Sequence, residues 1–217
     1  MTDFPLTITE AGSGEHTVLV LHGGRGPDSV TGIVEHFAPT EHVLAPTHPG
    51  WADTPRPDWF TGVDSLAIAY LDLLADAGRR DVTVIGSSFG GWVAAEMAVR
   101  DRGGVLGRLV LLDGIGPDIP GHPIQLPPGV PSLPALAAYT GEHLGDPKLL
   151  RRLARVTIPA QLIWGEDDPI VPPTFGKAYA AAFADGRFHT IPGVGHLPAV
   201  EAPEATFALI DEFLRRD

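Results

Sequence analysis

The 217-residue sequence contains no cysteine, which excludes a disulfide framework, thiol catalysis and metal sites built from thiolates. It is also poor in positive charge, because 15 Lys and Arg stand against 27 Asp and Glu and the formal net charge is −12. An acidic chain without a basic patch repels phosphate backbones and anionic lipids. We therefore expect no nucleic-acid partner and no membrane partner.

Long apolar runs are missing as well. No stretch reaches the roughly 18 consecutive apolar residues that a membrane span needs, and residues 1–6 lack the pattern of a secretion signal. We therefore predict a cytoplasmic protein, as a monomer or homodimer. The hydrophobic content of 44% is enough to fill a sizeable core, and the length is typical of one domain, which would span residues 1–217.

Short apolar runs bounded by turn residues alternate with helical patterns along the chain. Such runs are typical of strands buried on both faces of a parallel sheet. We therefore predict an α/β fold, a mostly parallel open sheet of about seven strands flanked by helices, with an antiparallel strand at one edge. The predicted strands are Val18–Leu21, Val82–Ile85, Leu109–Leu112 and Leu162–Trp164, with weaker ones at Leu6–Thr9 (the antiparallel edge), His42–Ala45 and Phe188–Ile191.

Three stretches have apolar residues at helical spacing, namely Val63–Leu74, Phe175–Phe183 and Phe207–Leu214. Thr61 and Asp64 are placed as an N-terminal cap signal for the first of them. Residues 114–150 depart from the alternation because they contain repeated prolines, and they can hold at most one helix, near Leu133–His143. We expect this segment to be a minimal cap outside the sheet.

Residues 86–90, Gly-Ser-Ser-Phe-Gly, fit the G-x-S-x-G pattern. They lie between the predicted strand Val82–Ile85 and the helical stretch Trp92–Val99, so the serine would stand on a sharp strand-to-helix turn. The glycines leave room for the hydroxyl to project and for a substrate to approach. The N-terminus of the helix supplies positive potential where an oxyanion would form. Ser88 is therefore a candidate nucleophile.

A serine hydroxyl is a weak nucleophile that needs a base and a group to orient the base. His196 follows the last predicted strand within Gly-Val-Gly-His, and Asp168 follows the strand ending at Trp164 within Gly-Glu-Asp-Asp. Both lie at the carboxyl ends of strands, where open α/β sheets place their sites. The chain order Ser88, Asp168, His196 agrees with the serine, acid, histidine order of one known hydrolase architecture.

In these motifs the sequence resembles the α/β-hydrolase superfamily over nearly the whole chain. The family's oxyanion loop, nucleophile elbow, acid turn and histidine loop resemble residues 22–24, 86–90, 165–168 and 195–201, and residues 48–51 resemble the loop after the next strand. The serine nucleophile is unlike the dehalogenase and epoxide-hydrolase branches, which use an aspartate. This difference favours acyl transfer over alkyl transfer.

The resemblance implies a cofactor-independent serine hydrolase. It implies Ser88 as nucleophile, His196 as general base and then acid, and Asp168 as the carboxylate that orients the imidazole. It also implies an oxyanion hole made by the backbone N–H groups of Gly24 and Phe89. No metal is expected, because His16, His36, His42 and His48 form no helical His-x-x-x-His pair and have no nearby cluster of carboxylates.

Several of these candidates have rivals. Ser87 adjoins the motif serine and Asp167 adjoins the motif aspartate, but the family spacing favours Ser88 and Asp168. Asp113 follows the strand Leu109–Leu112, where some branches of the family carry their acid.

Two residues of the oxyanion loop region have open roles. His22 is expected to brace the loop rather than react. Arg25 could meet an anionic group of the substrate or be an ordinary surface arginine.

The short cap predicts a pocket that is open or thinly covered, and hence a preference for short acyl chains. The predicted substrate contacts are Trp51, Leu126 and Tyr139, with Leu133 and Leu136 as further apolar contributors. The leading hypothesis is hydrolysis of a small carboxylic ester or related acyl compound. A cofactor-free non-hydrolytic enzyme acting by proton abstraction or carbon–carbon cleavage, and a small-molecule binding protein, remain as alternatives.

Overall fold

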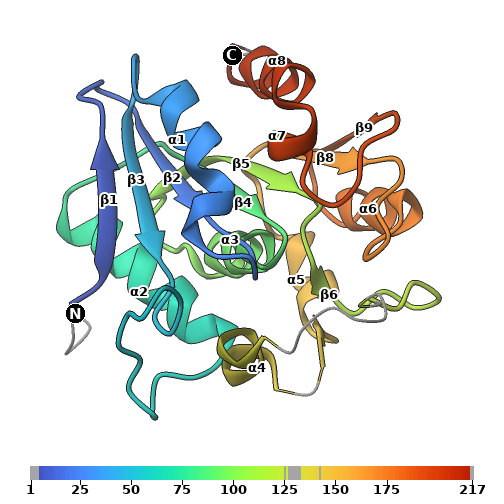
Figure 1. Cartoon of the computed structure of the whole chain (residues 1–217), viewed down its shortest axis with the longest axis horizontal. Helices are drawn as coiled ribbons and strands as arrows, with labels where there is room; N and C mark the ends of the chain where they lie inside the picture. Colours follow the sequence, from blue (N-terminus) through green and yellow to red (C-terminus); the bar gives the residue numbers. More distant parts are fainter. Residues whose placement is uncertain (1–4, 125, 127–132, 142, 216–217) are drawn as a thin grey trace.

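The computed structural model describes residues 5–124, 126, 133–141 and 143–215. Its central sheet has seven strands in the order β1-β3-β2-β4-β5-β8-β9 (Figure 1). All neighbouring strands run parallel except β1 and β3, which are antiparallel. The predicted sheet and its antiparallel edge are confirmed. The strands are β1 (Thr7–Ala11), β2 (Thr17–Leu21), β3 (His42–Thr47), β4 (Val82–Ser87), β5 (Leu106–Leu112), β8 (Ala160–Gly165) and β9 (Gly186–Ile191).

Helices cover both faces of this sheet (Figure 1). Side chains alternate along each strand, so β2 sends Leu19 and Leu21 to one core cluster and Val18 and Val20 to the other. The first cluster packs against α2 (Val63–Asp76), α3 (Phe89–Arg100), α4 (Pro134–Thr140), α5 (Leu149–Leu153) and α6 (Pro173–Ala180), and the second against α1 (Thr31–Phe37) and α8 (Pro203–Leu214). A 3₁₀ turn η1 (Pro27–Val30) precedes α1, and α7 (Pro198–Glu201) precedes α8.

The predicted helices exist, but the cap expected for α2 is wrong. Its N-cap is Gly62, with φ at 80°, and no side chain caps the helix. Thr61 instead offers its carbonyl to the hydroxyl of Ser65. Asp64 lies in the first turn, where its charge still interacts favourably with the helix dipole.

The segment 114–150 leaves the sheet after β5 and returns to it at β8. Its described residues include two short paired strands, β6 (Gly116–Pro117) and β7 (Gly145–Asp146), and the helix α4 within the predicted range. In Figure 1 this segment lies beyond one end of the sheet, alongside the carboxyl ends of the parallel strands. Among the described helices, none combines the length and apolar character that crossing a membrane would need.

Candidate active site

Ser88 occupies a strained turn between β4 and α3. Its φ is 52°, a left-handed conformation that L-residues rarely adopt, and it is the N-cap residue of α3. The turn is possible because its neighbours lack side chains: a Cβ on Gly90 would collide with the backbone of Leu21, and one on Gly23 would lie 2.8 Å from the Cβ of Ser88. The predicted strand-turn-helix context is therefore present, with Ser88 at its apex.

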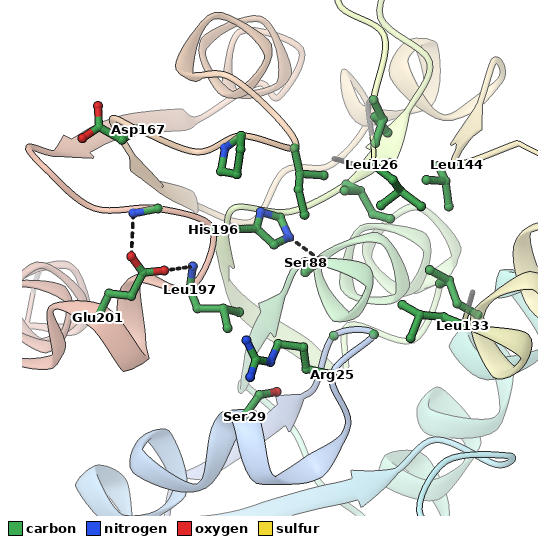
Figure 2. A pocket seen from close by; sticks show the side chains of 18 residues that line it. Arg25, Ser29, Ser88, Leu126, Leu133, Leu144, Asp167, His196, Leu197 and Glu201 are labelled. Atoms are coloured by element: carbon green, nitrogen blue, oxygen red, sulfur yellow. Dashed lines mark hydrogen bonds between the residues drawn. The ribbon is translucent and has the colours of Figure 1, made fainter. Parts of the chain in front are cut away.

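A continuous chain of hydrogen bonds joins Ser88, His196 and Asp168. The Oγ of Ser88 lies 2.8 Å from Nε2 of His196, and Nδ1 of the same ring lies 2.7 Å from Oδ2 of Asp168. When Nδ1 carries the proton, the ring donates to the carboxylate and accepts from the serine hydroxyl. The three residues follow the carboxyl ends of β4, β8 and β9, so residues far apart in the sequence meet at one end of the strands. Figure 2 shows His196 directed at Ser88.

Backbone N–H groups hold the Asp168 carboxylate in place. Its Oδ1 accepts from the N–H of Ile170 at 2.7 Å and from that of Val171 at 3.1 Å, which leaves Oδ2 for His196. Asp168 is buried. Hydrogen bonds of this kind favour the ionised carboxylate and fix its orientation.

Glu201 clamps the loop that carries His196. Its two carboxylate oxygens accept from the N–H of Gly195 at 2.8 Å and of Leu197 at 3.0 Å, one on each side of the histidine (Figure 2). The sequence did not predict this role, because the partners of Glu201 are backbone N–H groups. Almost every residue has such a group, so the residue types at these positions do not indicate the bonds. The only available signal was a carboxylate five residues after the histidine.

Two buried histidines brace the loop at residues 22–24. His22 donates from Nδ1 to the carbonyl of Gly23 at 2.7 Å, and its Nε2 accepts from the backbone N–H of His48 at 3.0 Å. His48 in turn donates from Nε2 to the carbonyl of His22 at 2.9 Å and accepts from the hydroxyl of Tyr70. Burial lowers the pKa of His22 to about 4 and that of His48 well below its usual value, so both rings are neutral near pH 7. The network matches the bracing role expected for His22.

Trp51 and Tyr139 lie elsewhere than predicted. We expected them to contact the substrate, but both are buried and neither lines the pocket beside Ser88. The indole N–H of Trp51 donates to the carbonyl of Gly24 at 3.0 Å, and the hydroxyl of Tyr139 donates to the carbonyl of Pro49 at 2.8 Å. Their rings stack with centroids 5.8 Å apart. The polar atoms of both buried rings are satisfied by loop carbonyls, so Trp51 holds the loop at residues 22–24 and Tyr139 holds the loop at residues 48–51.

The backbone N–H groups of Gly24 and Phe89 have no acceptor among the described residues. Phe89 is the first residue of α3, where a helix leaves its N–H groups without intrahelical acceptors. Within the described part of the chain, neither of these two N–H groups donates a hydrogen bond. Gly24 lines the same pocket as Ser88.

A cavity of about 630 Å³ opens beside Ser88 and His196 (Figure 2). Its walls are mainly apolar, and much of the apolar surface comes from the segment 114–150. Leu126, Leu133 and Leu136 line it as predicted, and Leu126 remains 47% exposed, so the described residues leave the cavity partly open on that side. The other apolar side chains in the lining are Ile115, Ile124, Leu144, Pro169, Ile170 and Leu197, and the polar and charged ones include Arg25, Ser29, Asp167 and Glu201.

None of the three rival residues takes the place of Ser88 or Asp168 in the hydrogen-bonded chain. Ser87 is buried at the end of β4, and Asp167 is exposed and lies away from His196 in Figure 2. Asp113 is fully buried near Asp168, and within the described part of the chain it makes no hydrogen bond to His196; its Oδ1 accepts from the N–H of Gly165 at 3.0 Å.

One group of side chains could be considered for a metal ion. Asp113, Asp168 and His196 each offer one ligand atom, and these atoms lie within 4.8 Å of one another. However, Oδ2 of Asp168 and Nδ1 of His196 already bond to each other, and Oδ1 of Asp168 accepts two backbone N–H groups. A metal ion would have to displace these hydrogen bonds, so these three side chains are better suited to bonding with one another and with the backbone than to binding a metal ion.

Comparison with known proteins identifies the family and supports the fold. The model of the alpha/beta hydrolase family matches residues 18–153 and 129–209. A 2-hydroxy-6-oxononadienedioate/2-hydroxy-6-oxononatrienedioate hydrolase of Cupriavidus pinatubonensis is 25% identical, over 98% of this chain and 91% of that protein.

Two solved structures share the fold. An esterase from Thermogutta terrifontis is 23% identical and superposes with a TM-score of 0.79, over 97% of this chain and 93% of the other. A meta-cleavage product hydrolase from Pseudomonas fluorescens is 17% identical, also with a TM-score of 0.79, over 96% of this chain and 93% of the other.

Proposed function

The chain belongs to the alpha/beta hydrolase family, and from this premise we propose that it is a serine hydrolase that cleaves a small carboxylic ester or a related acyl compound. The observation that carries the proposal is the unbroken hydrogen-bond chain from Ser88 through His196 to Asp168 at the wall of an apolar cavity. This arrangement has a nucleophile, a base and a group that orients the base, each within hydrogen-bond reach of the next.

In the proposed reaction, Ser88 Oγ attacks the carbonyl carbon while its proton passes to Nε2 of His196. The N–H groups of Gly24 and Phe89 stabilise the oxyanion, and Asp168 stabilises the imidazolium. The imidazolium then protonates the leaving alcohol, which yields an acyl-enzyme on Ser88. Neutral His196 next takes a proton from water, and the resulting attack releases the carboxylic acid and restores Ser88.

Acyl-enzyme trapping separates this proposal from its alternatives. Protein quenched during turnover of p-nitrophenyl acetate should gain one acetyl group on Ser88, found by mass spectrometry of the peptide. Turnover of another substrate class without any acyl-enzyme would instead favour proton abstraction by His196. Tight ligand binding with turnover near background would favour a binding protein.

Substrate length offers a further test. The cavity has to hold both the acyl group and the leaving alcohol, and its cover is incomplete beside Leu126. Each buried CH₂ is worth about 0.8 kcal/mol, roughly fourfold in kcat/KM, but only while the chain stays covered. We expect kcat/KM on p-nitrophenyl esters to be highest between acetate and butyrate. A steady rise from acetate to decanoate would contradict this, because it requires a long buried acyl tunnel.

A second candidate function is supported by Arg25. This exposed arginine lines the cavity, and within the described residues it forms no ion pair. The nearby Glu201 carboxylate already accepts two backbone N–H groups. A guanidinium here suits a substrate that carries its own carboxylate. The relative from Cupriavidus pinatubonensis is named for a substrate with two carboxylates, so hydrolytic carbon–carbon cleavage of an anionic keto acid is the alternative reaction.

The charge of Arg25 can be tested with two esters of equal length, one neutral and one ending in a carboxylate. Arg25→Gln should lower kcat/KM for the anionic ester by about 10- to 100-fold, the range for a lost hydrogen bond to a charged group. The value of kcat/KM for the neutral ester should change little. Arg25→Lys should give an intermediate loss for the anionic ester, because lysine keeps the positive charge but lacks the paired N–H donors of the guanidinium. Equal changes for both esters would remove Arg25 from substrate selection. A parallel assay with a 2-hydroxy-6-oxo-dienoic acid asks whether the carbon–carbon reaction occurs at all.

A further inference from the structure

Asp113 is a buried acid that the proposed reaction does not use. It follows β5, is 0% exposed, and has a φ of 43°. Its Oδ1 accepts from the backbone N–H of Gly165, while its Oδ2 has no hydrogen-bond partner among the described residues. A buried carboxylate oxygen without a partner is costly, so the state of this group needs a physical explanation.

Asp113 and Asp168 lie close together beside His196, and their hydrogen bonds differ. One oxygen of Asp113, one oxygen of Asp168 and one ring nitrogen of His196 lie within 4.8 Å of one another. Two ionised carboxylates this close in a buried place repel each other, so one of them tends to keep a proton. Asp168 accepts three N–H groups, which favours its ionised form, whereas Asp113 accepts one. Asp113 is therefore the acid that holds the proton.

The electrostatics of Asp113 agree with this geometry. Burial raises its pKa well above the usual range, and the neighbouring charge of Asp168 raises it further, while the Gly165 N–H acts in the opposite direction. Glu201, on α7, adds a weaker effect of the same sign as Asp168. His196 faces the same cluster from the loop after β9.

We propose that Asp113 is a positioning residue: it stays protonated at neutral pH, and its Oδ2–H donates to the Asp168 carboxylate and holds that carboxylate in line with Nδ1 of His196. This role rests on the hydrolase function proposed above. With Asp113 protonated, the two carboxyl groups together have a single negative charge beside the imidazole of His196. One charge stabilises the imidazolium that forms when Ser88 attacks, whereas a second would hold the proton on the ring and oppose its transfer to the leaving group.

Two variants that both tolerate the φ of 43° test the role of the proton. Asn is one of the residues enriched at positive φ; its amide oxygen can accept from Gly165 and its NH₂ can donate to Asp168, as the protonated acid would. We expect Asp113→Asn to keep kcat and the midpoint of the pH–rate profile near those of the wild type. Asp113→Gly fits the backbone but removes the donor, and it should lower kcat by about 10- to 100-fold and shift the midpoint.

If Asp113 acted instead as a second ionised acid, Asp113→Asn should lower kcat. If Asp113→Asn lost as much turnover as Asp168→Asn, the positioning role would be overturned. Equal kcat and equal pH midpoints in the glycine variant would overturn it as well, because the donor would then have no effect on the base.

Stability against pH tests the protonation state without using catalysis. A carboxyl whose pKa is raised on folding holds more protons in the native than in the unfolded state, so its contribution to stability falls as pH rises above its unfolded value. Asp113→Asn removes that loss. Its Tm relative to the wild type should therefore increase from pH 5 to pH 8, whereas a parallel pH dependence would show that native Asp113 is ionised. This result stands even if Ser88 proves not to be the nucleophile, so the two proposals fail separately.

Discussion

Ser88→Ala is expected to lower kcat on p-nitrophenyl acetate by about 10⁶-fold, the size of the loss when the serine of a comparable triad is removed. In the proposed reaction this hydroxyl is the attacking group, and no other described residue places a hydroxyl within hydrogen-bond distance of Nε2 of His196. The fold should persist, because among the described residues the side chain makes one hydrogen bond, to His196, and the strained φ of 52° is already adopted by a residue with a Cβ. Hydrolysis of the ester and a thermal unfolding curve measure the two expectations.

Ser87 supplies the matched control. It is buried at the end of β4, one residue from Ser88, so Ser87→Ala should leave kcat within a few-fold of the wild type. A fluorophosphonate probe should label Ser88 in the wild type and in the Ser87 variant, and fail to label the Ser88 variant. Label on Ser87, or full activity in Ser88→Ala, would assign the nucleophile elsewhere.

Asp168→Asn is expected to reduce kcat by about 10⁴-fold, as the corresponding change does in a comparable triad. The structure supplies the reason. Two N–H groups, from Ile170 and Val171, face one side of this group, so the amide oxygen of asparagine would stay there and its NH₂ would face Nδ1 of His196. The ring would then carry its proton on Nε2, toward Ser88, and lose its ability to act as a base.

The control for this substitution is Asp167→Asn. Asp167 adjoins Asp168 in sequence but is exposed and lies away from His196, so its variant should keep kcat within a few-fold (Figure 2). Measuring both variants on the same ester at one pH distinguishes the tautomer effect from a general effect of lost negative charge. Similar losses in the two variants would argue against Asp168 as the orienting acid.

Local sequence signals predicted the sheet and the hydrogen-bonded triad positions well. The buried strands appear as apolar runs, and Ser88, Asp168 and His196 each follow such a run within a glycine-containing turn. These patterns work because both the periodicity of a strand and the backbone demands of a tight turn act over a few neighbouring residues. The start of α2 is also determined by neighbouring residues, but there the sequence prediction was wrong. Gly62, at positive φ, is the N-cap residue, and no side chain caps the helix.

The sequence by itself therefore determined the fold class, the elbow serine and the order of the candidate catalytic residues, since each depends on short-range chemistry. Only the tertiary structure decided what surrounds them. It placed Trp51 and Tyr139 behind the loops at residues 22–24 and 48–51 instead of in the pocket lining. It also set Glu201 across the loop that carries His196 and brought Asp113 close to Asp168. These roles depend on long-range packing and on bonds to backbone atoms, which all residues share, so the identity of a side chain does not reveal them.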